Sequence, residues 1–302
     1  MYAIVETPLQ LLCAIEAKHY YNDQNFSIVV RYTARGKNDE QIRKILLDLN
    51  VTAIEVNFPS SGNYFRKYLN LIVVALRLRS NVKILFLGSA FSKFQRTLAS
   101  LVGFEHLWYL DDGFATLSYD SKNHRSKLKA NLFTMFDDWK FAKGVTVVPN
   151  QFSWLRSQVK SINSSKSYFI GQPLVEREFL TLSDYLHLIQ VSLKHCQGDL
   201  VYVPHRVECD EVLEKLCRIE GLRIERVEGS VEWYFIVNGL YPKNVYGINS
   251  TALFTLSKMF PETKVFYFSC DFKNYPNMDH LKKIESCLEG SKKLNELRIS
   301  ET

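Results

Sequence analysis

The sequence lacks the features that mark metal-binding, secreted or membrane-spanning chains. None of its six cysteines forms a pair with the two-residue gap of a zinc knuckle, so we expect reduced thiols in a cytoplasmic protein. The N-terminus has no basic start and carries Glu6, which argues against a secretory signal. The longest apolar run, Leu69 to Leu76, is too short to span a bilayer. We therefore expect a soluble chain, at most peripheral at the cytoplasmic face of the inner membrane.

The first turn of the chain lacks a glycine cluster. It reads Glu6-Thr7-Pro8 and follows an apolar strand-like run, Tyr2 to Val5. This excludes the dinucleotide fingerprint and the P-loop, both of which need glycines where the backbone approaches phosphate. Thr7 and Pro8 instead predict a helix start, with an N-cap followed by a first-turn proline.

The remaining composition is that of a globular α/β protein. The chain has 302 residues, of which 46% are hydrophobic and 23% charged, enough for about two domains. Apolar runs alternate with helical patterns, which predicts parallel, doubly wound sheets. A stretch rich in serine and asparagine at 161–167 predicts a linker, so we place the domains at 1–160 and 161–302. The ligand is expected in a cleft where the carboxyl ends of both sheets meet.

The net charge of +6 is concentrated in basic clusters, for example Arg77 with Arg79. Such clusters suit an anionic substrate, nucleic acid or a lipid surface, and they also occur on ordinary solvated faces. The polar, basic and aromatic stretch from Phe114 to Lys143 is predicted to be a loop or hairpin followed by a helix that bears Phe133, Phe136 and Trp139. We expect its part from His124 to Trp139 to meet an acceptor or the inner face of the membrane.

Two carboxylates and a glycine, Asp111-Asp112-Gly113, follow the apolar run from Leu107 to Leu110. A strand that ends on paired acids places charge at the sheet edge where ligands bind in open α/β folds. Like charges repel, so one carboxyl can keep its proton near neutral pH and serve as a base. The structural alternative is a β-turn, since Asp-Gly is common turn chemistry. The spacing does not distinguish which aspartate is the base.

A second loop carries His205, Arg206 and Glu208 between an expected strand and a helix. Arg206 can fork onto phosphate or carboxylate, and His205 can donate to a phosphate oxygen or pass it a proton. Glu208 can orient either partner, and the helix N-terminus adds its dipole. An isolated His-Arg pair is equally compatible with an ordinary surface.

A third loop, Asn249-Ser250-Thr251, follows Gly247 and opens an apolar helix. One such residue suffices to cap a helix. Three in a row after a glycine favour a phosphate held by the hydroxyls and by the N–H groups of the first turn. A base on one domain and a phosphate site on the other fit a sugar nucleotide.

The acidic, histidine and serine-threonine loops, in this order, resemble the motifs of bacterial sialyltransferases of the GT-B type. The run from Thr7 to Leu12, the Gly171-Gln172-Pro173 strand end and the Tyr-x-Pro-His-Arg-x-Glu stretch are most similar to glycosyltransferase family 52, which includes lipooligosaccharide and capsule sialyltransferases. The resemblance extends over roughly residues 1–270. One departure is Arg206, which stands where the motif usually has proline.

The resemblance implies a GT-B-like fold, with two Rossmann-like domains facing across a cleft. It implies an inverting transfer, without metal or cofactor, from CMP-sialic acid to a hydroxyl of a bacterial surface glycan or glycolipid. The base would be Asp111 or Asp112 on the N-terminal, acceptor-side domain, and His205 would stabilise or protonate the departing CMP phosphate. Donor or phosphate contacts in the C-terminal domain would be Gly171, Gln172, Arg206, Glu208, Asn249, Ser250 and Thr251, and acceptor-side or cleft positions would be Thr7, Gln10 and Gly113.

Other functions are compatible with the same residues. The same fold accepts CMP-Kdo, another CMP-nonulosonate or a UDP-sugar as donor. A non-catalytic nucleotide-binding or nucleic-acid-binding protein would use the same basic loop and the +6 charge. The acidic pair lies where nucleic acid would have to approach, so we expect no nucleic-acid partner.

Overall fold

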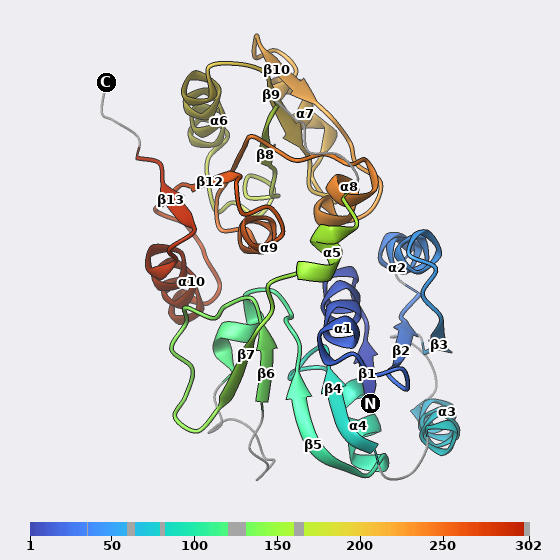
Figure 1. Cartoon of the computed structure of the whole chain (residues 1–302). Coiled ribbons are helices and arrows are strands. Elements are labelled where there is room, and N and C mark those ends of the chain that lie inside the picture. Colours follow the sequence, from blue (N-terminus) through green and yellow to red (C-terminus); the bar gives the residue numbers. More distant parts are fainter. Residues whose placement is uncertain (35, 59–63, 79–81, 120–130, 160–165, 299–302) are drawn as a thin grey trace. The chain divides into compact units, whose positions relative to one another are not determined.

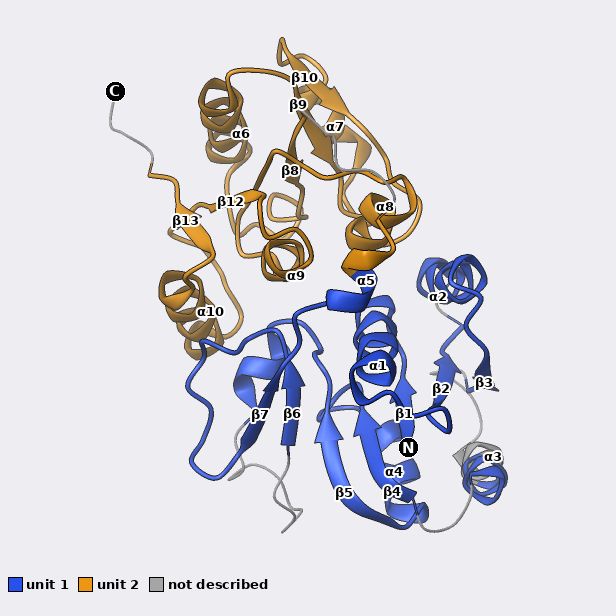
Figure 2. Ribbon diagram, in the orientation of Figure 1, with its two compact units in different colours: residues 1–155 blue, residues 156–302 orange. Residues whose placement is uncertain are grey.

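The computed structural model of the chain describes residues 1–34, 36–58, 64–78, 82–119, 131–159 and 166–298. The chain forms two compact units, Met1–Leu155 and Arg156–Thr302 (Figure 2). Each unit contains its own parallel sheet with helices between most successive strands (Figure 1). The predicted α/β class with two doubly wound units is therefore confirmed.

Unit 1 has a seven-stranded sheet in the order β3-β2-β1-β4-β5-β6-β7. Every strand pair is parallel; Ile4 of β1, for example, pairs with Val29 of β2 and with Leu87 of β4. The strands are β1 (Tyr2–Val5), β2 (Ser27–Tyr32), β3 (Ala53–Asn57), β4 (Val82–Leu87), β5 (Phe104–Tyr109), β6 (Asn131–Thr134) and β7 (Thr146–Pro149). The helices are α1 (Pro8–Tyr21), α2 (Gly36–Asp48), α3 (Tyr64–Arg77), α4 (Lys93–Leu101), the 3₁₀ helix η1 (Ala115–Ser118) and α5 (Ser153–Ser157).

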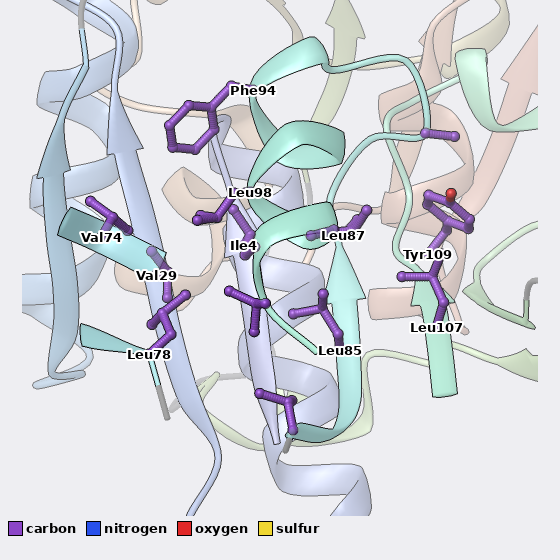
Figure 3. Packing of buried hydrophobic residues seen from close by; sticks show 14 of the residues in the cluster. Ile4, Val29, Val74, Leu78, Leu85, Leu87, Phe94, Leu98, Leu107 and Tyr109 are labelled. Carbon is purple, nitrogen blue, oxygen red and sulfur yellow. The ribbon is translucent and has the colours of Figure 1, made fainter. Parts of the chain in front are cut away.

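Helices cover both faces of this sheet because successive strand side chains point to opposite sides. Leu85 and Leu87 of β4 are buried in a cluster with residues of α3 and α4, as Figure 3 shows. Phe86, between them, packs instead against Tyr21 of α1, with ring centroids 5.5 Å apart. A strand buried on both faces accounts for the apolar run from Ile84 to Leu87 in β4.

Unit 2 has a six-stranded parallel sheet in the order β10-β9-β8-β11-β12-β13. On one face Phe169 of β8 contacts Tyr185, and on the other Tyr168 contacts Phe235. The strands are β8 (Ser167–Ile170), β9 (Leu200–Val203), β10 (Leu222–Ile224), β11 (Asn244–Gly247), β12 (Lys264–Tyr267) and β13 (Leu294–Glu296). The helices are α6 (Leu182–Cys196), α7 (Asp210–Leu216), α8 (Val231–Val237), α9 (Thr251–Met259) and α10 (Met278–Gly290).

The helix expected to bear Phe133, Phe136 and Trp139 is wrong. Phe133 lies in strand β6, which pairs with both β5 and β7, and Phe133 and Phe136 are buried. Tertiary pairing thus overrides an accidental helical spacing of aromatic residues. The basic residues from His124 to Lys129 lie outside the described residues, as does most of the predicted linker at 161–167.

The two sheets share one topological feature that positions ligands. In unit 1 the strand order reverses between β1 and β4, and in unit 2 it reverses between β8 and β11. Loops that leave neighbouring strands in opposite directions at such a point leave a crevice at the carboxyl ends, which is where open α/β sheets bind ligands. Within the described residues, no helix is long and apolar enough to cross a membrane.

Candidate functional site

The predicted acidic loop lies at the carboxyl end of β5, beside the switch point of unit 1. Its two aspartates are in different environments. Asp111 is fully buried and Asp112 only partly buried. The structure therefore separates two carboxyls that the sequence presents as equivalent.

Both carboxyl oxygens of Asp111 are engaged inside the protein. Thr134 Oγ1 donates to Oδ1 at 2.5 Å, and the Met135 backbone N–H donates to Oδ2 at 2.8 Å. Burial raises the pKa of Asp111 to about 7, although these hydrogen bonds act in the opposite direction. Because Thr134 ends β6 and Met135 follows it, Asp111 joins the ends of two neighbouring strands.

Asp112 lines a small pocket of about 10 Å³ at the ends of β4 and β5. Its backbone N–H donates to Thr116 Oγ1 at 2.9 Å, and its Oδ1 accepts from Gln10 Nε2 at 2.7 Å. A pocket of this size has room for about one water molecule or one hydroxyl group. The other residues that line it are Ala90, Phe91, Tyr109, Leu110, Thr116, Tyr119 and Leu132.

The remaining predicted residues of unit 1 shape this edge. Thr7 caps α1 by accepting from the Gln10 backbone N–H at 3.3 Å, as expected. Gly113 has φ 65°, a left-handed conformation that favours glycine and turns the chain from Asp112 into η1. The Asp-Gly turn and the carboxylate at the strand end are thus both present.

In unit 2, the loops after β8 and β11 meet across the switch point. Gln172 Nε2 donates to the Asn249 carbonyl at 2.9 Å. Two buried polar atoms here, Gln172 Oε1 and Asn249 Nδ2, have no hydrogen-bond partner within the described residues. An unused acceptor and an unused donor at a ligand-binding edge suit a polar ligand, since buried polar groups are normally paired.

A buried hydrogen-bond chain shapes the histidine loop. Glu208 accepts from the His205 backbone N–H and from the Tyr202 hydroxyl. The hydroxyls of Tyr202 and Tyr185 are hydrogen-bonded at 2.8 Å, and the Gln172 backbone N–H donates to the Tyr185 hydroxyl at 3.0 Å. Burial raises the pKa of Glu208 to about 7. Glu208 therefore orients the His205 loop through the backbone.

Gly171 is required by this close packing. A Cβ at this position would lie 2.5 Å from the Tyr202 hydroxyl and 2.6 Å from Glu208 Oε2. Both distances are far below van der Waals contact, and the neighbours are buried and hydrogen-bonded. A glycine at this position therefore allows the loop to pack closely against Tyr202 and Glu208.

His205 and Arg206 are exposed at the end of β9. Partial desolvation, together with the positive charges of Arg206 and Arg177, lowers the pKa of His205, which favours the neutral imidazole. The Val207 backbone N–H donates to His205 Nδ1 at 3.4 Å, so the ring proton of the neutral form belongs on Nε2. The loop thus offers one guanidinium and one imidazole N–H donor.

Ser250 is the N-cap of α9, and its Oγ accepts from the Ala252 backbone N–H at 3.3 Å. Thr251 is the first residue of this helix. Ser250 therefore caps the helix, which is the structural alternative for this loop. The N-terminus of α9, the positive end of its dipole, lies at the same sheet edge as Gln172. The predicted set in unit 2 is thus gathered along the ends of β8, β9 and β11.

Several side chains in these hydrogen-bond networks were not predicted from the sequence as site residues. Tyr185 belongs to an amphipathic helix and gave no signal, whereas Tyr202 lies within the Tyr-x-Pro-His-Arg stretch that carried the family resemblance. Gln95 lies in α4 and Phe91 just before that helix, and neither belongs to one of the three loops that the sequence singled out. Among the described residues, no group of three or more histidine, cysteine, aspartate or glutamate side chains is placed to hold a metal.

No protein-family model matches the sequence, and neither does any curated protein. Solved structures do match. The α/β-galactoside α-2,3-sialyltransferase of Photobacterium phosphoreum has a TM-score of 0.53 and 12% identity, over 98% of this chain and 97% of that one. A Photobacterium sp. 2,6-sialyltransferase, in complex with CMP and lactose, has a TM-score of 0.50 and 13% identity, over 98% and 78%.

An enzyme of another kind is similar to the same extent. The UDP-GlcNAc 2-epimerase of Methanocaldococcus jannaschii has a TM-score of 0.56 and 10% identity, over 98% of this chain and 88% of that one. Similarity at such low identity establishes the fold alone. The chain thus has the two-domain α/β fold of GT-B glycosyltransferases, and membership of family 52 stays a prediction.

Proposed function

We propose that this protein is a glycosyltransferase that transfers sialic acid, or a related nonulosonic acid, from a CMP-activated donor to a glycan hydroxyl. The observation that carries the proposal is the placement of Asp112, a partly buried carboxylate that lines a hydroxyl-sized pocket at a strand end. The fold shared with two sialyltransferases supports the choice of donor. The motif order of the sequence supports it independently.

Asp112 is assigned as the base in the proposed reaction. Its carboxylate takes the proton of the acceptor hydroxyl as that oxygen forms a bond to the anomeric carbon. The bond between this carbon and the CMP phosphate oxygen breaks, and CMP leaves with the electron pair. This single displacement inverts the anomeric centre. Asp111 is not assigned a chemical role, because Thr134 and Met135 occupy both of its oxygens.

The donor is assigned to unit 2. His205 Nε2–H and Arg206 would contact the phosphate or the sugar carboxylate, and Ser250 with Thr251 would bind phosphate at the N-terminus of α9. The unused acceptor and donor at Gln172 and Asn249 match the mixed polar edge of a pyrimidine base. CMP carries a single phosphate, so the proposal includes no metal and no cofactor.

The acceptor is assigned to the edge of unit 1. Phe91 follows β4, is 50% exposed and lines the Asp112 pocket with Tyr109 and Tyr119. An exposed ring beside a hydroxyl-sized pocket suits a sugar whose apolar face packs on the ring while one hydroxyl reaches Asp112. A bacterial surface glycan, built on a lipid at the cytoplasmic face of the inner membrane, remains the predicted acceptor.

Two alternatives keep the fold. The similarity to a UDP-GlcNAc 2-epimerase favours a UDP-sugar as the second candidate donor, and CMP-Kdo fits the same chemistry. A non-catalytic nucleotide-binding protein would use the residues of unit 2 and leave Asp112 without a role. These functions differ in which nucleotide is released and in whether any is released.

A donor panel tests the proposal. Purified protein is incubated with CMP-sialic acid, CMP-Kdo and UDP-sugars, with and without galactose-terminated acceptors, and free CMP or UDP is measured. We expect acceptor-dependent CMP release, a loss of at least about 100-fold in Asp112→Asn, and unchanged release in Asp138→Asn, which alters an exposed aspartate. Release of UDP alone would replace the donor, and CMP binding without turnover would refute catalysis.

A further inference from the structure

Two buried glutamine side chains connect the backbone to Asp112. Ser89 N–H donates to Gln95 Oε1 at 2.9 Å, Gln95 Nε2 donates to Gln10 Oε1 at 3.2 Å, and Gln10 Nε2 donates to Asp112 Oδ1 at 2.7 Å. The Glu6 backbone N–H also donates to Gln10 Oε1, at 2.9 Å. Gln10 and Gln95 are 2% and 0% exposed. The chain of bonds crosses the switch point of unit 1.

The direction of every bond in this chain is determined. A backbone N–H is always a donor, so Ser89 requires the oxygen of the Gln95 amide, and Glu6 requires the oxygen of the Gln10 amide. The NH₂ group of each amide must therefore point away from that backbone N–H, so Gln95 donates to Gln10 and Gln10 donates to Asp112. The Gln10 NH₂ then faces Asp112, which must supply an oxygen without a proton.

The surrounding structure allows little room for another arrangement. A Cβ at Gly88 would lie 2.3 Å from Gln10 Oε1, so the glycine at the end of β4 is what admits this side chain. Glu6 is itself held by Arg31, whose guanidinium lies 2.8 Å from the carboxylate, and by the Ser92 hydroxyl. The acceptor position of Gln10 is thus held by β1, β4 and α4 together.

We propose that Gln10 and Gln95 are positioning residues that fix the carboxyl of Asp112, with Oδ1 held by Gln10 and Oδ2 left for the acceptor proton. This inference rests on the proposed function for its catalytic meaning. Two other acids belong to this end of the sheet: Glu6, paired with Arg31, and Asp111, bonded to Thr134 and Met135. Neither accepts from the Gln10 amide through its side chain.

The bond itself is tested without any activity. The side-chain amide resonance of Gln10, assigned in ¹⁵N spectra by its loss in Gln10→Leu, is followed from pH 3 to pH 9. We expect it to shift with pH in the wild type, to exchange slowly with solvent, and to lose its titration in Asp112→Asn. A Gln10 amide that exchanges as fast as that of Gln151, whose NH₂ bonds Asp137 at 2.9 Å on the surface, overturns the proposal.

The positioning role is tested by pH–rate profiles of folded variants. Gln10→Glu keeps the acceptor oxygen but places a second carboxylate against Asp112, so the pair shares a proton and the acidic limb should move upward by at least about one pH unit. Gln10→Leu removes a donor to a charged group, which should lower kcat about 10- to 100-fold while the donor KM stays constant. Gln95→Leu, one link further away, should lower kcat about 2- to 10-fold.

Gln151→Leu is the matched control, because it breaks an exposed glutamine–aspartate bond of the same kind and should leave the profile unchanged. A Gln10→Glu enzyme with wild-type melting temperature and an unshifted acidic limb refutes the positioning role. Equal losses of kcat in the Gln10 and Gln151 variants refute it as well. If the wild type transfers no sugar from any donor, the proposed function fails, and the amide titration still decides whether the bond to Asp112 exists.

Discussion

Replacing Asp111 with asparagine should make the protein less sensitive to rising pH. Asp111 is fully buried, and burial raises its pKa from 3.8 to about 7. The folded state therefore holds this proton more tightly than the unfolded state does. The resulting stabilisation is complete below pH 3.8 and is lost as the pH rises through about 7.

The magnitude follows from the same shift. Each tenfold change in proton affinity is worth about 1.4 kcal/mol, so the free energy of unfolding should fall by about 4 kcal/mol between pH 4 and pH 8 relative to the variant. Asparagine is neutral at every pH and nearly isosteric. Its Oδ1 can accept from Met135, and its NH₂ can donate to the Thr134 hydroxyl, so the variant should fold.

The assay is urea unfolding of the wild type and Asp111→Asn at several pH values, followed by tryptophan fluorescence. Glu208 also has a raised pKa, but its contribution is common to both proteins and cancels in the difference. Asp138→Asn, at an exposed position, should show no pH-dependent difference. A difference that stays constant with pH, or a wild type that gains relative stability as pH rises, would refute the buried, proton-retaining carboxyl.

Three further predictions concern the two sheet edges. Gly171→Ala should lower the free energy of unfolding of unit 2 by about 1–3 kcal/mol in urea and weaken CMP binding in calorimetry, because the added methyl group meets the Tyr202 hydroxyl. Gly290→Ala, where the added methyl group meets no atom, should be neutral. His205→Ala should lower kcat about 10- to 100-fold through loss of a donor to the leaving phosphate. Phe91→Ala should raise the acceptor KM several-fold and leave the donor KM unchanged, and equal increases in both would contradict its assignment to the acceptor.

The strand–helix order of both units was predictable because it depends on local rules. Thr7 with Pro8, and Ser250 before α9, start helices wherever the sequence places them, and the run in β4 is apolar because the strand is buried on both faces. The stretch around Phe133 was mispredicted because a short aromatic spacing is compatible with strand and helix alike. Pairing with β5 and β7, which only the folded chain provides, decides the matter.

The sequence by itself determined that acids, a histidine loop and a serine-threonine loop lie at strand ends, since each follows directly on an apolar run. It left Asp111 and Asp112 equivalent, because adjacent residues have the same composition around them. Only the tertiary structure separates the two: β6 brings Thr134 and Met135 onto Asp111, and α1 brings Gln10 onto Asp112 from 102 residues away. Burial and hydrogen-bond partners come from distant segments, so the chemistry of a carboxyl is decided by the fold.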